Sequence, residues 1–161
     1  MMLNQIARLQ QTLCGYAPLF IRLPLGIIMI AHGMDKAFGT FHGGGFAETV
    51  KGFAEMGMQP ATVTAGLAVL GELGGGILVL LGLLTPIGAF LIAATMAVAV
   101  FAVHFSAGLF AQDGGYEYPL ALLGAALSLM FSGGGKCSID ALLMGKNACA
   151  NHYDSSGVCS L

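Results

Sequence analysis

Six ionisable side chains in this sequence lie within or at the ends of long apolar stretches, where they could bind a ligand or handle protons. A charged side chain at the centre of a membrane helix costs about 2.5–3.5 kcal/mol, so it normally faces the protein interior and has a purpose. Arginine and lysine can hold a negatively charged or polar group, whereas histidine and glutamate can exchange protons. The six candidates are Arg22, His32, Lys36, Glu72, His104 and Glu117.

Arg22 and Glu72 are expected to lie deepest in the membrane. If Ala37 and Ala61 mark the outer ends of the first two apolar stretches, a rise of about 1.5 Å per residue places the two charges within about one turn of each other. This estimate predicts an Arg22–Glu72 ion pair. The pair could belong to a functional site, with Glu72 orienting Arg22 or accepting a proton, or it could only fix the register of the helices.

The other four candidates are expected near the outer end of the bundle. His104 and Glu117 could carry protons at the mouth of a cavity shared with Arg22 and Glu72. Simpler alternatives are open for each: His32 as a hydrated helix-end residue, Lys36 as a marker of the membrane surface, His104 as a single hydrogen-bonded histidine, and Glu117 as an interfacial anchor.

Small residues share helical faces with these polar residues, which predicts that the faces pack inward. In the second stretch the face comprises Ala65, Ala68, Glu72, Gly75, Gly76 and Val79. In the third it comprises Ala93, Ala97, Val100 and His104. In the fourth it comprises Glu117, Ala121, Gly124 and Ser128.

Composition assigns the chain to a broad class. Of 161 residues, 57% are hydrophobic and 9% are charged, and the mean hydropathy is +0.84. Soluble domains carry about 25% charged residues, so we predict an integral membrane protein surrounded by lipid. The net charge is -2 without a basic run, which gives no support for a nucleic-acid partner.

The predicted fold is a single all-α membrane domain over residues 1–161, built as an antiparallel bundle of four transmembrane helices. The spans are expected at about 17–37, 61–83, 87–105 and 116–131. Between the first two, Phe46, Val50 and Phe53 recur at helical spacing, which predicts a short amphipathic helix in the membrane interface. This helix could cover the bundle as a lid or serve only as a connector.

The positions of Lys and Arg predict which side of the membrane the termini face, and the cysteines of the C-terminal tail bear on metal binding. Arg8, Lys136 and Lys146 lie on the side of the termini, against Lys36 and Lys51 on the other, which favours cytoplasmic termini. The polar tail, 144–161, carries Cys149 and Cys159, whose loose spacing does not predict a metal site.

Short motifs along the chain resemble the DoxX family of small membrane proteins. The resemblance covers residues 19–143, and no single motif is diagnostic, but their order and spacing together are specific. The motifs are RLPLG at 22–26, HGMDK at 32–36, ELGGG at 72–76, LGLLT at 81–85, HF at 104–105, GYEYP at 115–119, GGG at 133–135 and SID at 138–140.

This resemblance implies a four-helix bundle in the bacterial cytoplasmic membrane that acts as a subunit of an oxidoreductase assembly linked to quinone or to sulfur and thiol chemistry. It leaves the cofactor unassigned, with quinone as a candidate, and implies a protein partner or homo-oligomer in addition to the lipid bilayer. The alternative function is a non-catalytic membrane scaffold or a carrier of small solutes. The sequence alone does not decide whether the chain is itself an enzyme.

Overall fold

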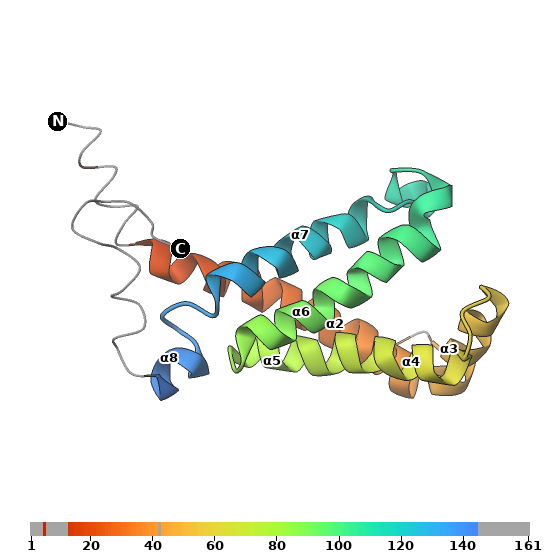
Figure 1. Ribbon diagram of the computed structural model, residues 1–161, viewed down its shortest axis with the longest axis horizontal. Helices are drawn as coiled ribbons and strands as arrows, with labels where there is room; N and C mark the ends of the chain where they lie inside the picture. The colour runs from red at the N-terminus through yellow and green to blue at the C-terminus, as the bar shows by residue number, and fades with distance from the viewer. Residues whose placement is uncertain (1–4, 6–12, 42, 145–161) are drawn as a thin grey trace.

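The computed structural model describes residues 5, 13–41 and 43–144 of the chain. Within these residues the secondary structure is helical, without strands. The principal helices are α2 (Ala17–Phe38), α3 (Gly45–Glu55), α4 (Ala61–Val69), α5 (Gly75–Leu81), α6 (Thr85–Val98), α7 (Glu117–Ser132) and α8 (Ile139–Leu143). Figure 1 shows α2, the α4–α5 rod, α6 and α7 running alternately between the two ends of the molecule.

Three helical rods are apolar and long enough to cross a membrane, namely Cys14–Phe38, Ala61–Leu81 and Thr85–Ala107. The fourth apolar helix, Glu117–Ser132, has 16 residues, or about 24 Å at 1.5 Å per residue, which is shorter than a hydrocarbon core of about 30 Å. The protein is therefore an integral membrane protein, as the composition predicted. Many large apolar side chains on these helices are exposed, including Phe20, Leu67 and Phe90, as expected for surfaces that contact lipid.

Local sequence explains where the membrane helices begin and end. Pro18 lies in the first turn of α2 and Pro86 in that of α6, where the missing N–H of proline removes no helical hydrogen bond. Gly39 and Gly82 end α2 and α5 in the left-handed conformation, with φ of 67° and 69°, which glycine adopts without steric strain. The observed helices agree with the predicted spans to within about two residues at most ends.

Glycines set how closely α2 approaches the α4–α5 rod. A Cβ atom added to Gly26 would lie 2.8 Å from Leu80 Cβ, and one added to Gly76 would lie 2.9 Å from the backbone nitrogen of Ile30. Gly33 packs in the same way against Leu73. These three contacts fix the register of the pair, and they place Glu72 at the level of the turn that contains His32 and Lys36.

The inward face predicted for the second span is confirmed, because all six of its residues are buried. The face predicted for the fourth span is wrong. Glu117, Ala121, Gly124 and Ser128 are exposed, whereas Pro119, Leu122, Ala126 and Leu129 are buried. Leucine as well as alanine fills the space between α7 and its neighbours, so the smallest residues of α7 do not mark its packed face.

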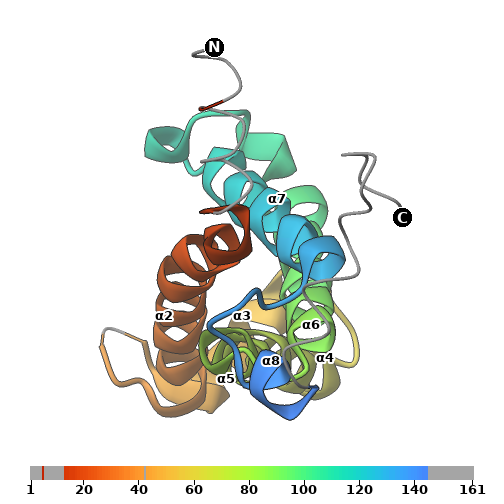
Figure 2. The same ribbon diagram turned by 90° about the vertical axis from the view of Figure 1, so that its left-hand side faces the viewer.

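The helices separate at one end of the molecule. In Figures 1 and 2, α6 and α7 lie side by side, and their ends near residues 104–117 diverge from α3 and α4. The buried core between the helices contains Leu25, Met29, Ile92 and Leu129. The space where the two halves begin to separate is where the polar side chains gather.

The predicted amphipathic helix is present as α3, joined to the end of α2 by a turn that Asp35 organises. Asp35 Oδ1 accepts hydrogen bonds from the backbone N–H groups of Phe41 and Gly43, at 3.0 and 2.9 Å. Thr49 Oγ1 donates to the carbonyl of Lys36, which fastens α3 to α2. Helix α8 was not predicted. Of the predicted tail, Cys149 and Cys159 lie outside the described residues.

Candidate functional site

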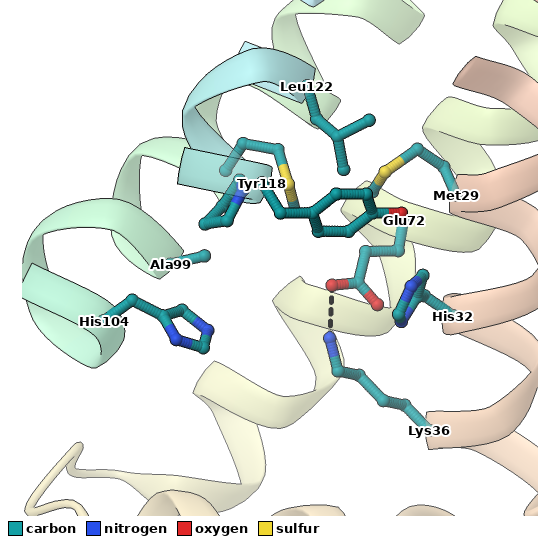
Figure 3. A pocket seen from close by; sticks show the side chains of 10 residues that line it. Met29, His32, Lys36, Glu72, Ala99, His104, Tyr118 and Leu122 are labelled. Atoms are coloured by element: carbon teal, nitrogen blue, oxygen red, sulfur yellow. Dashed lines mark hydrogen bonds and ion pairs between the residues drawn. The ribbon is translucent and has the colours of Figure 1, made fainter. Parts of the chain in front are cut away.

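A cavity of about 120 Å³ lies among α2, the middle of the α4–α5 rod, α6 and α7. Four of the six predicted candidates line it: His32, Lys36, Glu72 and His104. Figure 3 shows their side chains around one space, with Tyr118 entering from α7. The remaining lining residues are Met29, Met96, Ala99, Pro119 and Leu122, so the cavity has apolar walls and a few polar groups.

Glu72 is the most buried polar group of the cavity, with 2% of its surface exposed. Its Oε1 atom forms an ion pair with Lys36 Nζ. Its Oε2 atom is buried and has no hydrogen-bond partner in the described part of the chain. A buried carboxylate oxygen without a partner is unfavourable, so a cavity beside it is where a hydrogen-bond donor would be stabilised.

The two polar groups that face each other across the cavity lie on π-helical segments. Glu72 lies in Leu70–Gly74, and His104 ends Ala99–His104. Ala99 and His104 are five residues apart. In an α-helix, two side chains at this spacing point about 140° apart around the helix axis. The wider π turn instead brings His104 to the same side as Ala99, where both line the cavity. π-Helical segments are rare in proteins, and those that occur are often found at functional sites.

His104 is oriented by the loop that follows α6. Its Nδ1 atom lies 2.7 Å from the carbonyl oxygen of Gly114. A carbonyl oxygen can only accept, so Nδ1 carries the proton of this hydrogen bond and Nε2 of the neutral ring is an acceptor. On the other wall, the rings of His32 and Tyr118 lie with centroids 6.4 Å apart. His32 and Tyr118 are both exposed at the edge of the cavity.

Arg22 does not line the cavity, and the predicted Arg22–Glu72 pair is wrong. The Arg22 guanidinium is buried and donates to four backbone carbonyls. Its Nε and Nη2 atoms donate to Val79 and Leu80, at 2.9 and 3.1 Å. Its Nη1 atom donates to Gly134 and Cys137, at 2.6 and 3.2 Å. Arg22 therefore satisfies the last carbonyls of α5 and ties them to the segment after α7.

Helix register explains why the pairing prediction failed. The prediction placed Ala37 and Ala61 at one level. The contacts of Gly26 and Gly33 shift the two helices by about two turns from that alignment. Glu72 then meets Lys36, while Arg22 meets the end of α5. Loop length and hydropathy do not fix this register, because α3 and its turns take up an unknown length of chain.

Glu117 also lies outside the cavity lining. It is exposed at the first residue of α7, and its Oε1 atom accepts a hydrogen bond from the backbone N–H of Ala111 at 2.7 Å. The prediction that His104 and Glu117 share one cavity with Arg22 and Glu72 is therefore wrong for Arg22 and Glu117. The loop returns the chain at the expected level, but α7 presents Tyr118 and Pro119 to the cavity.

Sequence reasoning did not assign a role to Asp140, whose carboxylate binds the start of α6 next to the α5 end that Arg22 binds. Asp140 Oδ1 accepts from the backbone N–H of Leu84 at 2.7 Å, and Oδ2 accepts from the N–H and the hydroxyl of Thr85, both at 2.9 Å. Asp140 thus caps the start of α6, while Arg22 caps the end of α5. The signal in the sequence was Ser138, which accepts a hydrogen bond from the N–H of Ala141 and starts a short helix.

The described residues contain no group of three or more His, Cys, Asp or Glu side chains that could hold a metal ion.

Helix α3 contributes no residue to the cavity lining, so the cavity is not covered by the predicted lid.

Comparisons with known proteins identify the family. Neither the curated proteins nor the solved structures include a match to this chain. The DoxX family matches residues 17–105, which is more than half of the 161-residue chain. The matched segment runs from α2 to the π-helical end of α6, so it holds Lys36, Glu72 and His104. Because the match covers that share of the chain, the protein is a member of the DoxX family.

Proposed function

We propose that this protein is the small membrane subunit of a redox-linked assembly, and that the cavity at Glu72 binds the reacting molecule and exchanges protons with it. The observation that carries the proposal is the Glu72 carboxylate, which lines the cavity, pairs with Lys36 through one oxygen, and holds its other oxygen buried without a hydrogen-bond partner in the described residues. Membership of the DoxX family supports a redox association.

The position and chemistry of the cavity fit such a role. Glu72 lies eleven residues after Ala61, or about 16 Å along the helix, within a helical rod that is apolar and long enough to cross a membrane. An ionisable side chain within such a rod is a functional candidate by default. A quinone becomes a quinol by taking up two electrons and two protons. Glu72 and His104 are groups that can exchange those protons, and a partner protein supplies or receives the electrons.

Lys36 takes the part that the sequence assigned to Arg22. The four hydrogen bonds of the Arg22 guanidinium go to backbone carbonyls, so its charge serves the fold. Lys36 instead brings positive charge to Glu72 through the ion pair. The reacting molecule is either a quinone or a sulfur or thiol compound, the two chemistries that the family resemblance implies.

We further propose that α7 completes an antiparallel bundle of four spans in the bacterial cytoplasmic membrane. The alternating helix directions support this arrangement, and short spans can be accommodated by local thinning of the bilayer. An even number of spans places both ends of the chain on one side. The excess of Lys and Arg on that side favours a cytoplasmic location for the termini.

A small-solute carrier is the second candidate. The cavity volume of about 120 Å³ equals about four water molecules at roughly 30 Å³ each, below the roughly 300 Å³ of common ligand pockets. A carrier of small polar molecules would need a cavity of this kind, and the exposed His32 and Tyr118 would form its rim. This function predicts uptake of a solute without electron transfer.

The experiment that separates the two uses a bacterial strain that lacks its own copy of this gene. Membranes from cells producing the wild type, Glu72→Gln or Glu55→Gln are compared at equal protein level for quinone reduction driven by thiols or thiosulfate. Glu55 is a matched control because it is exposed on α3, away from the cavity. We expect Glu72→Gln to lower the rate at least tenfold and Glu55→Gln to leave it unchanged. Equal rates in these three membranes and in membranes of the strain without the protein would refute the redox role.

A further inference from the structure

We infer that the cavity selects an uncharged ligand that donates a hydrogen bond from an aromatic hydroxyl, and that it rejects anions. The inference rests on the proposed function for the location of the ligand, and of the proposed reacting molecules it selects the hydroxyl-bearing reduced form of a quinone, the quinol. It follows from the charges, the hydrogen-bonding capacity and the walls of the cavity.

The formal charges of the cavity lining sum to zero. Lys36 and Glu72 are the lining residues with opposite formal charges, and they are paired with each other. Arg22, the buried cation that could have attracted an anion, donates to carbonyls at the end of α5. An anion such as thiosulfate would enter a space with no net positive charge and would face a carboxylate oxygen. Like charges in a site of low dielectric constant repel strongly.

Two residues that line the cavity, Glu72 and His104, carry acceptor atoms. Glu72 Oε2 is a buried acceptor without a partner in the described residues, and an ionised carboxylate can only accept. In the neutral ring of His104, Nε2 is an acceptor because Nδ1 donates to the carbonyl of Gly114. A ligand with an O–H group would satisfy such an acceptor, and hydrogen bonds to a charged acceptor are the stronger kind. A carbonyl or an ether oxygen at the same place would leave Glu72 Oε2 unsatisfied.

The walls favour an aromatic ring. Met29 and Met96 line the cavity together with Leu122 and Pro119, and methionine sulfur makes favourable contacts with aromatic rings. The volume is about 120 Å³, somewhat below the roughly 150 Å³ of an apolar cavity that is known to bind benzene. One six-membered ring therefore fills the space, with the hydroxyl on Glu72 and any larger substituent outside.

Equilibrium dialysis on the full chain in lipid nanodiscs tests this inference. The probes are phenol, anisole and thiosulfate, with empty nanodiscs measuring partition into lipid. Anisole has the ring and the oxygen of phenol but no O–H donor. We expect saturable phenol binding that is at least tenfold tighter than anisole binding, and no displacement of phenol by thiosulfate. In Glu72→Gln the preference for phenol over anisole should fall at least threefold, and in Glu55→Gln it should be unchanged.

Three outcomes overturn the inference: equal binding of phenol and anisole, displacement of phenol by thiosulfate, or absence of saturable binding to the wild type. Binding needs no electron donor or partner protein, so the result is independent of the redox assay. If phenol preference fails while Glu72→Gln still blocks electron transfer, only the ligand class is wrong. If the preference holds while electron transfer is unaffected, the redox role is wrong and the ligand class stands.

Discussion

Glu72 should be energetically coupled to Lys36 and independent of Arg22. This contrast is measured with two double-mutant cycles, one with Lys36→Met and Glu72→Met, the other with Arg22→Met and Glu72→Met. Each cycle compares the change in the free energy of unfolding of the double variant with the sum of the two single changes. The structure makes opposite predictions for the two cycles because the ion pair joins Glu72 to Lys36.

The magnitudes follow from burial and separation. Lys36→Met leaves a carboxylate whose side chain is 3% exposed without its partner, and removing one member of a buried pair costs about 3–5 kcal/mol. The Lys36 side chain is 31% exposed, so we expect the lower end, about 3 kcal/mol. Residues in direct contact show coupling of about 0.5–3 kcal/mol, and we expect about 1–3 kcal/mol for Lys36 and Glu72.

Arg22→Met should be at least as damaging, for a different reason. It removes the side-chain donor of four carbonyls, of which Val79 keeps a hydrogen bond from the N–H of Gly82, and we expect a loss of about 3–5 kcal/mol. Its coupling to Glu72 should stay below about 0.5 kcal/mol. The carbonyl of Val79 that binds Arg22 lies seven residues from Glu72, which is about 10 Å along the helix.

The assay is unfolding of the protein in mixed micelles as the mole fraction of dodecyl sulfate rises. Near-ultraviolet circular dichroism of the tyrosines reports tertiary packing, since the chain has no tryptophan. The control is Glu55→Met, which should change the free energy of unfolding by less than about 0.5 kcal/mol. Coupling of Arg22 to Glu72 above about 1 kcal/mol, with none between Lys36 and Glu72, would show that the structural assignment of the pair is wrong.

Three further predictions test the fold. Gly26→Ala should destabilise the protein by about 1–3 kcal/mol because the new Cβ would meet Leu80; Gly124→Ala, with open space around it, should be neutral or stabilising by up to about 1 kcal/mol in the same unfolding assay. Asp140→Asn should cost about 1–2 kcal/mol, since it weakens the cap of α6, and an unchanged midpoint would contradict that role. In a variant whose only cysteine is Cys137, an impermeant thiol reagent should label spheroplasts only after permeabilisation; labelling of intact spheroplasts would reverse the proposed topology.

The sequence anticipated the helices because their causes are local. Apolar runs long enough to span hydrocarbon predicted the membrane helices, and Pro86 and Gly82 mark a turn that needs no tertiary information. The amphipathic spacing of Phe46, Val50 and Phe53 predicted α3 for the same reason. Helix α8 escaped notice because five residues give too short a pattern to establish a period.

The sequence also selected most of the ionisable residues that line the cavity. Charge within an apolar run is unfavourable, and that rule selected Lys36, Glu72 and His104, all of which line the cavity. The same rule selected Arg22, which the structure uses to satisfy carbonyls at a helix end. Buried charge in the sequence therefore indicates a partner but does not tell whether the partner is a ligand or the protein itself.

By itself the sequence determined that the chain is an α-helical membrane protein and that Arg22 and Glu72 lie buried in it, whereas two other candidates, His32 and Glu117, are exposed. Tertiary structure alone decided the pairing of those side chains, because pairing depends on the register of helices. That register is set by close contacts at Gly26, Gly33 and Gly76, between residues distant in the chain. The π turn that ends at His104 and the buried face of α7 also depend on packing between neighbouring helices, which local sequence does not specify.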